Sequence, residues 1–284
     1  MVTVSDVLKN GTDILSAHDI ENYKFESSCI FEKAFGVKYR TPAYDRIKNS
    51  ELDEAVAEQF CELIRRRIDG EPLQYILGEW EFYGLPFKVG RGVLIPRQDT
   101  ETLVDFLLDY FNNRENLRFA DLCSGSGCIG ITLEKKLKCD KAYCVELSDK
   151  AISYLKENIR LNGSACECVK GDVLLEQTAE SFENLDFIAC NPPYLTAGDM
   201  KNLQTEVQFE PKSALFGGED GLDFFRCVTR IWKNSLKAGG VLAFEIGINQ
   251  EEEVSQILIQ HGFQNVRFMK DYCGVFRIVY GVKD

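Results

Sequence analysis

LRFADLCSGSGCIG, residues 117–130, is the stretch that decides which fold this sequence predicts. Its first six residues indicate a strand, and Gly125, Gly127 and Gly130 then follow in the spacing G-x-G-x-x-G. Glycine lets the backbone turn sharply and lie close to a ligand. We therefore predict a strand that passes through a tight, ligand-facing turn into a helix.

Strands and helices alternate from this stretch toward the end of the chain. The predicted strands are 117–122, 141–147, 167–171, 185–190 and 241–246, and the predicted helices are 128–137, 149–161, 221–236 and 250–260. This order is typical of a mostly parallel, doubly wound α/β sheet of the Rossmann-like kind. The closing residues 266–271 and 275–281 flank Cys273-Gly274 and predict a hairpin that places an antiparallel element at the sheet edge.

The first part of the chain has a different pattern. Residues 1–70 indicate helices, most clearly at 51–68, where apolar residues recur on one helical face. Residues 79–96 are rich in aromatic and β-branched residues and predict a hairpin. We expect three parts, which are a small all-α bundle at 1–75, a β-hairpin connector at 76–97 and the α/β domain at 98–284.

A carboxylate follows the glycine turn at the distance that adenosine-containing ligands require. Glu146 ends the second predicted strand, 19 residues after Gly127, where a carboxylate can accept both hydroxyls of a ribose. This pattern fits NAD, FAD or S-adenosylmethionine. Asp172, after the third predicted strand, lies where it could approach an adenine edge, and turn chemistry explains it equally well.

The strand at 185–190 ends on Asn191-Pro192-Pro193-Tyr194. Ligands of a doubly wound sheet bind beyond the carboxyl ends of its strands, so this turn reaches the same rim as the glycines. The asparagine offers an acceptor oxygen, the prolines leave main-chain carbonyls as acceptors, and the tyrosine adds a flat ring. Together they suit a planar NH2 group. The alternative is a proline-rich turn with an incidental asparagine cap.

Such a grip suits methyl transfer to nitrogen. An amide nitrogen is a poor nucleophile because its lone pair is delocalised, and holding both N–H bonds aims it as charge develops. A sulfonium methyl donor needs alignment for in-line displacement and no metal. A dehydrogenase is a weaker match, because no histidine for hydride chemistry stands near the rim.

Composition narrows the class of protein further. The formal charge is −12, and residues 1–96 hold 12 Lys or Arg against 16 Asp or Glu, which argues against a reader of naked nucleic acid. Arg65-Arg66-Arg67 ends a helical pattern, where cations favour the helix dipole; a phosphate patch is the alternative. The 11 cysteines form no Cys-x-x-Cys pair and only two histidines exist, so we expect no metal site.

No apolar run approaches 18 residues, and the N-terminus lacks a signal-peptide pattern. We therefore expect a cytoplasmic protein, with reduced cysteines and no membrane span.

Five stretches carry a resemblance to a known family. They are PLQYILGEWEFYGLPFKVGRGVLIPRQDTE (72–101), DLCSGSGCIGI, CNPPYL, EVQFEPKSALFGGEDGL (206–222) and LKAGGVLAFEIG (236–247). From about residue 70 onward the chain resembles the glutamine N5-methyltransferases of peptide-chain release factors, the HemK/PrmC type; residues 1–70 fit by architecture only. The resemblance implies a helical N-terminal domain that contacts a class 1 release factor, and an S-adenosylmethionine-dependent domain that methylates the glutamine of its Gly-Gly-Gln loop.

The resemblance also implies roles for individual residues. The donor is expected to lie against Cys123, Ser124, Gly125, Ser126 and Gly127, with Glu146 on the ribose, Asp172 or Val173 by the adenine, and Asn191 abutting it. The glutamine amide is expected to lie against Asn191, Pro192, Pro193 and Tyr194, with Asn191, Pro192 and Tyr194 as the catalytic residues.

Some positions depart from the family pattern. Cys123-Ser124 replaces Gly-Thr, which preserves the turn if φ at Cys123 is negative; Glu146 replaces the commoner Asp; and Gln98 replaces a proline. Arg97 either reaches the substrate or forms an ion pair at a domain interface. Asp99 or Thr100 is expected to cap the following helix, and Glu210 either borders the site or supports its loop.

Two other functions remain open. An amino-methyltransferase acting on adenine or cytosine in nucleic acid would use the same Asn-Pro-Pro-Tyr chemistry, although its recognition domain would usually be basic. A donor-binding interaction protein without chemistry would not need an intact Asn-Pro-Pro-Tyr turn. A monomer is the simplest expectation for the assembly.

Overall fold

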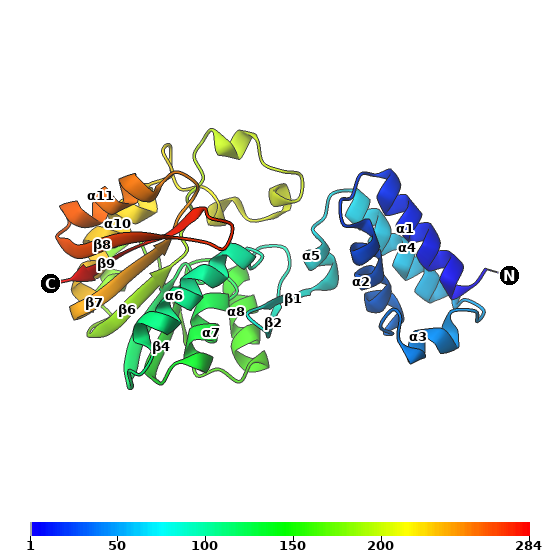
Figure 1. The fold of residues 1–284 in the computed structure, drawn as a ribbon, viewed down its shortest axis with the longest axis horizontal. Coiled ribbons are helices and arrows are strands. Elements are labelled where there is room, and N and C mark those ends of the chain that lie inside the picture. Colours follow the sequence, from blue (N-terminus) through cyan, green and yellow to red (C-terminus); the bar gives the residue numbers. More distant parts are fainter. Residues whose placement is uncertain (1) are drawn as a thin grey trace. The chain divides into compact units, whose positions relative to one another are not determined.

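The computed structural model of the protein describes residues 2–284 and divides into two compact units (Figure 1). The first unit contains the residues up to Glu79 together with Gln204–Phe209. The second contains Trp80–Leu203 and Glu210–Asp284.

The first unit is helical. Its helices are α1 (Val4–Ala17), α2 (Tyr23–Phe35), α3 (Pro42–Ile47), α4 (Glu54–Ile68) and α5 (Leu73–Leu77), and η3 (Val207–Phe209) is a 3₁₀ turn. The core is aromatic, since the ring of Phe31 lies 4.4 Å from that of Phe35 and 6.3 Å from that of Phe60. Gly11 fits against this core because a Cβ there would lie 2.6 Å from the Phe60 ring.

The three consecutive arginines lie in the last turn of α4, as the sequence predicts. Arg67 is 4% exposed and forms ion pairs with Glu26 and Glu206. Arg66 pairs with Glu71 and Arg65 with Glu62. Carboxylates of the same unit therefore occupy all three guanidinium groups, which speaks against a phosphate patch.

The second unit contains a seven-stranded sheet in the order β5-β4-β3-β6-β7-β9-β8. The strands are β3 (Leu117–Leu122), β4 (Cys139–Glu146), β5 (Glu167–Lys170), β6 (Leu185–Cys190), β7 (Leu236–Glu245), β8 (Phe263–Lys270) and β9 (Phe276–Lys283). Strands β3 to β7 pair in parallel, whereas β9 runs antiparallel to both β7 and β8. The predicted α/β class and its closing antiparallel hairpin are confirmed.

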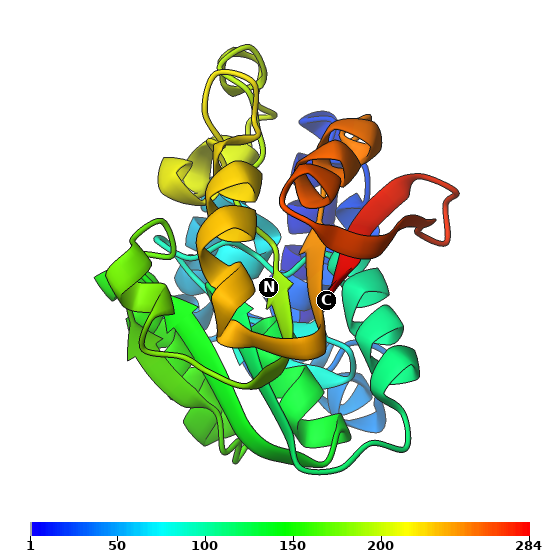
Figure 2. The same cartoon turned by 90° about the vertical axis from the view of Figure 1, so that its left-hand side faces the viewer.

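Helices cover both faces of this sheet (Figures 1 and 2). One face carries α6 (Glu101–Phe111), α7 (Cys128–Lys136) and α8 (Asp149–Leu161); the other carries α9 (Glu176–Ala179), α10 (Asp223–Trp232) and α11 (Glu251–Gln260). Along β6, Phe187 and Ala189 pack into the core on the α6–α8 face, while Ile188 and Cys190 pack into the core on the α9–α11 face. A strand buried on both sides reads as a continuous apolar run, which is why LDFIAC is so easily recognised.

Some predicted boundaries shift. Strand β7 begins at Leu236, five residues before the predicted start, and α10 ends at Trp232 and passes into the 3₁₀ turn η5 (Lys233–Ser235). The predicted hairpin at 79–96 forms β1 (Glu79–Phe82) and β2 (Leu85–Lys88) only, around Tyr83 and Gly84 at φ 55° and 76°. The remaining 3₁₀ turns are η1 (Gln98–Thr100), η2 (Asp199–Lys201) and η4 (Lys212–Ala214).

Candidate functional site

The candidate site lies where the carboxyl ends of β3, β4 and β6 meet. The glycine turn follows β3, Glu146 ends β4 and Asn191 follows β6. Because β3 pairs in parallel with both β4 and β6, these three ends are neighbours. They border a cavity of about 560 Å³, a size typical of small-molecule sites.

Most of the predicted site residues line this cavity. They are Arg97, Cys123, Ser124, Gly125, Ser126, Glu146, Asp172, Val173, Asn191 and Pro193. Gly127 instead stands at the N-cap position of α7, where a Cβ would lie 2.4 Å from Leu155, and Pro192 is buried. Tyr194 lines a second cavity of about 780 Å³. The turn from Asn191 to Tyr194 therefore borders both cavities.

The glycine turn is built from left-handed backbone. Gly125 and Gly127 have φ of 55° and 82°, which glycine adopts without strain. Cys123 also has a positive φ, 57°, so the turn forms although the condition stated for it, a negative φ at Cys123, is not met. The left-handed conformation costs a side-chain-bearing residue about 1–2 kcal/mol, which explains why glycine suits this position better.

Two polar side chains brace the turn from within the second unit. The Ser124 hydroxyl donates to the carbonyl of Asp121 at 2.7 Å and lies 3.1 Å from that of Val145. Asn158 of α8 is fully buried and donates to the Ser126 carbonyl at 2.9 Å. Asn158 could not be predicted from the sequence, because nothing in a surface-like helix pattern distinguishes an asparagine that contacts a distant loop.

Glu146 is tied to the same turn. Its Oε2 accepts the Gly125 N–H at 2.8 Å, and its Oε1 accepts the N–H groups of Leu147 and Ser148 at 2.9 and 2.8 Å. A carboxylate has about four acceptor positions, so about one is left at Oε2 for a ligand hydroxyl. A second ribose hydroxyl would have to replace one of the three backbone donors.

The residues expected beside adenine, Asp172 and Val173, follow β5 in the chain and line the same cavity. Asp172 Oδ1 accepts the Leu174 N–H at 2.9 Å, so its turn role is observed. Asp172 and the buried Val173 nevertheless both line the cavity that Glu146 lines. The cavity size, the backbone turn and the free carboxylate position fit an adenosine-type donor.

Asn191 is held by a residue outside its own motif. Its Nδ2 donates to Thr100 Oγ1 at 3.4 Å. Thr100 occupies the N-cap position of α6, but its side chain makes no capping bond, and Asp99 forms an ion pair with Arg277 at 2.8 Å. The predicted capping role of these two residues is therefore wrong, because tertiary partners engage both side chains.

A buried carboxyl lies beside this asparagine. Cys190 of β6 pairs with Phe244 of β7, so Asn191 and Glu245 come next on neighbouring strands. Glu245 is 3% exposed, and its burial raises the pKa to about 7, while hydrogen bonds from Thr100 and Asn191 act against that rise. The sequence offers one usable signal for it, which is an acid at the end of an otherwise apolar strand.

Arg97 and Glu210 form an ion pair inside the second unit. Glu210 is 4% exposed and also accepts the Ile95 N–H at 3.0 Å, so it supports the loop that borders the cavity. Arg97 stays partly exposed on the cavity wall. The pair is not made between the two units, which removes the interface alternative for Arg97.

Two absences concern residues 2–284. No three His, Cys, Asp or Glu side chains there come together in an arrangement that would hold a metal ion. Nor does any helix in that range have the length and apolar character needed to cross a bilayer.

Comparison with known proteins identifies both parts of the chain. Residues 97–216 match the family model described as methyltransferase small domain, and residues 6–78 match the PrmC N-terminal domain. Among solved structures, a methyltransferase from Pyrococcus furiosus superposes with a TM-score of 0.54 at 18% identity, covering 71% of this chain and 90% of that one. The Thermus thermophilus 16S rRNA N2 G1207 methyltransferase in complex with AdoMet and guanosine gives 0.54 at 15%, covering 72% and 50%. At these identities the structures establish the fold alone.

Curated relatives have a higher sequence identity to this chain than these solved structures have. The release factor glutamine methyltransferase of Clostridium acetobutylicum is 39% identical over 82% of both chains. The proteins of the same name from Geobacter sulfurreducens and Clostridium botulinum are 36% and 34% identical and cover 98% and 97% of this chain and 96% and 98% of their own. The chain belongs to the family of release factor glutamine methyltransferases.

Proposed function

We propose that this protein transfers a methyl group from S-adenosylmethionine to the side-chain amide nitrogen of the glutamine in the Gly-Gly-Gln loop of a class 1 release factor. One observation carries the proposal: Asn191 and Pro193 line the same cavity as Glu146 and residues 123–126 of the glycine turn. A methyl donor and a planar amide could thus meet there. Family membership supports the choice of a protein glutamine as acceptor.

The donor side uses mostly backbone. Residues 123–127 provide close approach, Glu146 offers its remaining acceptor position to a ribose hydroxyl, and Asp172 and Val173 flank the adenine. The bound sulfonium supplies an electrophilic methyl group that needs no metal to be displaced.

The acceptor side uses directed hydrogen bonds. Because Asn191 Nδ2 is engaged by Thr100, Asn191 Oδ1 is the atom left to accept one N–H of the substrate amide. The Pro192 carbonyl is proposed to accept the other, and the Tyr194 ring to lie against the amide plane. With both N–H bonds held, the nitrogen attacks the methyl carbon as the carbon–sulfur bond breaks. S-adenosylhomocysteine leaves with the bond's electron pair, and the methylated nitrogen gives one proton to solvent water. Alignment of this kind supplies several kcal/mol of the barrier reduction.

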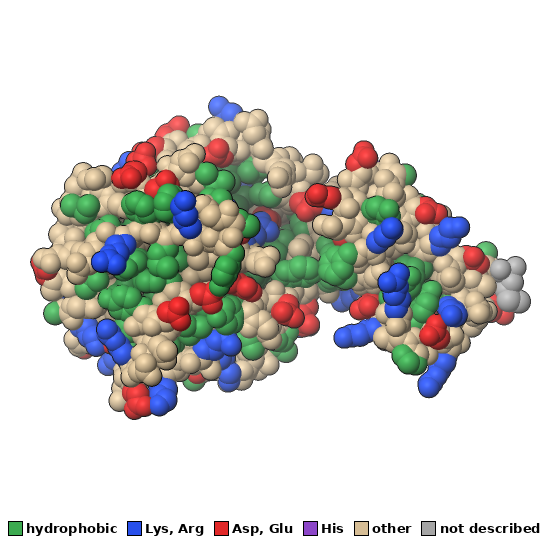
Figure 3. All heavy atoms as spheres, in the orientation of Figure 1, with side chains coloured by type: hydrophobic (Ala, Val, Ile, Leu, Met, Phe, Trp, Pro, Cys, Tyr) green, Lys and Arg blue, Asp and Glu red, His purple; other side chains and the backbone are tan. Residues whose placement is uncertain are grey.

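The helical unit is proposed to recognise the release factor, and residues 76–97 are proposed to connect it to the methyltransferase domain. The protein is proposed to be a cytoplasmic monomer that does not bind nucleic acid directly. Acidic and basic side chains are interspersed over the face in Figure 3, and Arg65 to Arg67 are all paired with carboxylates. Neither feature favours a nucleic-acid amino-methyltransferase, which would usually carry a basic footprint.

A methyl-transfer assay with labelled S-adenosylmethionine tests the proposal. Its three acceptors are a class 1 release factor, the same factor with the Gly-Gly-Gln glutamine changed to alanine, and duplex DNA. Label on the first alone is expected. Label on the DNA, or on the alanine variant as strongly as on the parent factor, would contradict it.

A further inference from the structure

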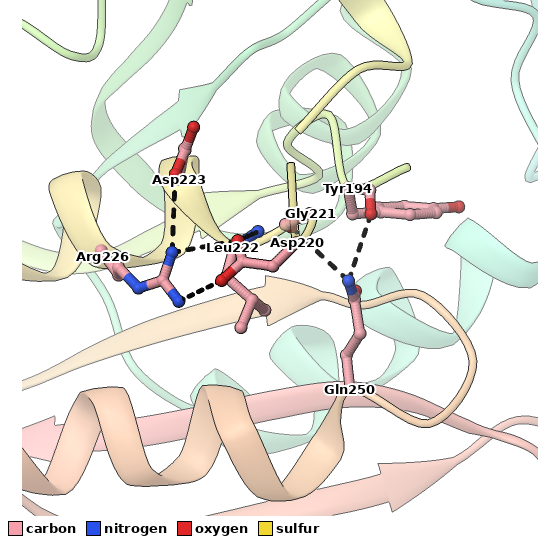
Figure 4. Close-up of polar contacts among 7 residues, drawn as sticks. All are labelled: Tyr194, Asp220, Gly221, Leu222, Asp223, Arg226 and Gln250. Atoms are coloured by element: carbon pink, nitrogen blue, oxygen red, sulfur yellow. Dashed lines mark hydrogen bonds and ion pairs between the residues drawn. The ribbon is translucent and has the colours of Figure 1, made fainter. Parts of the chain in front are cut away.

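One side-chain amide ties the Asn191–Tyr194 turn to two other segments (Figure 4). Gln250 Nε2 donates to the carbonyl of Tyr194 at 3.1 Å and lies 3.5 Å from that of Gly221. Its Oε1 accepts the Gly247 N–H at 2.8 Å. Both ends of the amide are thus used, and each end has a fixed role as donor or acceptor.

Three glycines pack against Pro193, Tyr194 and the Gln250 amide. A Cβ at Gly217 would lie 2.6 Å from the Pro193 oxygen and 2.7 Å from the Tyr194 Cα. At Gly221 it would lie 2.3 Å from the Tyr194 oxygen, and at Gly247 it would lie 2.8 Å from Gln250 Oε1. A methyl group at Gly217 or Gly221 would clash with the backbone of Pro193 or Tyr194, and one at Gly247 would crowd the Gln250 amide and the Tyr194 ring, so two segments pack against the turn.

The loop that contributes two of these glycines is itself anchored. The Leu195 N–H donates to the Leu215 carbonyl at 2.8 Å, and the Gly217 N–H donates to the Leu195 carbonyl at 2.9 Å. At the other end of the loop, Arg226 pairs with Asp220, as Figure 4 shows. Gln250 therefore joins the turn to a fixed support.

A helix-capping role does not explain Gln250. It stands at the N-cap position of α11, but its side chain makes no capping hydrogen bond. Its amide is directed at Tyr194 and Gly221 instead.

We propose that Gln250 is a positioning residue for methyl transfer, which sets the direction of the Tyr194 carbonyl and thereby aims the Pro192 carbonyl and the Tyr194 ring at the substrate amide. This inference rests on the proposed function for its chemistry. Its structural half, the donation to Tyr194, is testable without any substrate.

The decisive variant is Gln250→Glu, which keeps the shape but replaces the donor with a carboxylate facing two carbonyls. At about pH 8 we expect kcat to fall about 10- to 100-fold, the loss typical of a misplaced reacting group, with the Kd for S-adenosylmethionine unchanged. A protonated glutamic acid regains one donor, so the ratio of variant to wild-type kcat should recover as the pH falls toward about 5. Gln256→Glu, an exposed position of α11, is the matched control and should match the wild type throughout.

Other charged groups lining the cavity at Tyr194 and Gln250 are Asp199, Asp220, Arg226, Glu253 and Arg277. They are unchanged in both variants, so taking each rate relative to the wild type at the same pH removes their titration from the comparison.

Amide hydrogen exchange of the free protein gives a readout independent of activity. Exchange at Leu195 and Gly217 should be faster in Gln250→Glu than in the wild type at about pH 8, and unchanged in Gln256→Glu. A purely structural role predicts a lowered melting temperature with a loss of kcat that acid does not reverse, and that result would overturn the proposal. Wild-type exchange and kcat in Gln250→Glu would overturn it as well. If the wild type methylated no release factor, the proposed function would fail, and the exchange result would still decide whether Gln250 orders the turn.

Discussion

The glycine turn and the Asn191–Tyr194 turn both follow a buried strand, yet they are held in different ways. Partners of the glycine turn lie on the next strand or on the helix after it, such as Glu146, whose Oε2 accepts the Gly125 N–H, and Asn158, which lies 32 residues after Ser126. The Asn191–Tyr194 turn depends on residues far along the chain, because Thr100 lies 91 residues before Asn191 and Gln250 lies 56 residues after Tyr194. The donor site is thus mainly local, whereas the amide site is assembled by the tertiary fold.

The comparison predicts that the two turns fail differently when they are mutated. Damage to the glycine turn should lower donor affinity. Damage to the Asn191–Tyr194 turn should lower the rate of the chemical step with the donor still bound.

The largest expected effect is on turnover in Asn191→Ala. Removing an oriented hydrogen-bonding group from a reacting centre typically costs about 10²–10³ in rate, and we expect a loss of that size when Asn191 Oδ1 is removed. Single-turnover methyl transfer to a release factor measures this. Turnover within a few-fold of the wild type would remove the amide-gripping role, and Asn202→Ala in the following loop is a control at an exposed asparagine.

Next in size is the loss of donor affinity in Glu146→Ala. Hydrogen bonds to a charged group contribute about 1.5–3 kcal/mol, so the Kd for S-adenosylmethionine should rise about 10- to 100-fold. Calorimetry measures the change. Glu146→Asp, the residue commoner in the family, should retain most of the affinity, and an unchanged Kd in the alanine variant would exclude a ribose role.

A third effect concerns the dependence of stability on pH. Burial raises the pKa of Asp121, which lies under the glycine turn, from 3.8 to about 8. The folded protein then binds a proton that the unfolded chain releases, so stability should fall as the pH rises from about 4 to about 8, by at most about 1.4 kcal/mol per pH unit for this group. Glu245, with its pKa raised to about 7, acts in the same direction.

Asp121→Asn removes one of these two groups and should flatten the profile of melting temperature against pH. Thermal unfolding between about pH 5 and about pH 8 measures the slope. A variant whose slope equals that of the wild type would show that Asp121 is not protonated in the folded protein.

The smallest effect is expected from Cys123→Gly. Relieving a left-handed residue in the glycine turn should stabilise the fold by about 1 kcal/mol, less the entropy that glycine adds to the unfolded chain. Chemical denaturation measures the difference. Destabilisation by more than about 1 kcal/mol would mean that contacts of the Cys123 side chain outweigh its strain.

The same contrast explains what the sequence could reveal. The strand β6, the glycine spacing and Glu146 follow from local patterns, and each lies where it was predicted. The early start of β7 was missed because LKAGG contains two glycines, which weaken a strand pattern; its pairing with β6 at Leu236 extends it.

The supports of the amide site could not be predicted in the same way. Thr100 carries a helix-cap signal, and only the fold shows that its hydroxyl meets Asn191. Gln250 looks like an ordinary polar residue at the start of a helix, although its amide holds the carbonyl of Tyr194. The positive φ of Cys123 was likewise hidden, because a cysteine in the sequence does not report its backbone conformation.

The most direct test of the division between the two turns is a calorimetric titration of S-adenosylmethionine into Asn191→Ala, run beside Glu146→Ala. We predict that Asn191→Ala binds the donor with a Kd within about threefold of the wild type, a difference below about 1 kcal/mol, while Glu146→Ala binds at least about tenfold more weakly. Equal loss of donor affinity in both variants would contradict the separation of donor binding from amide positioning.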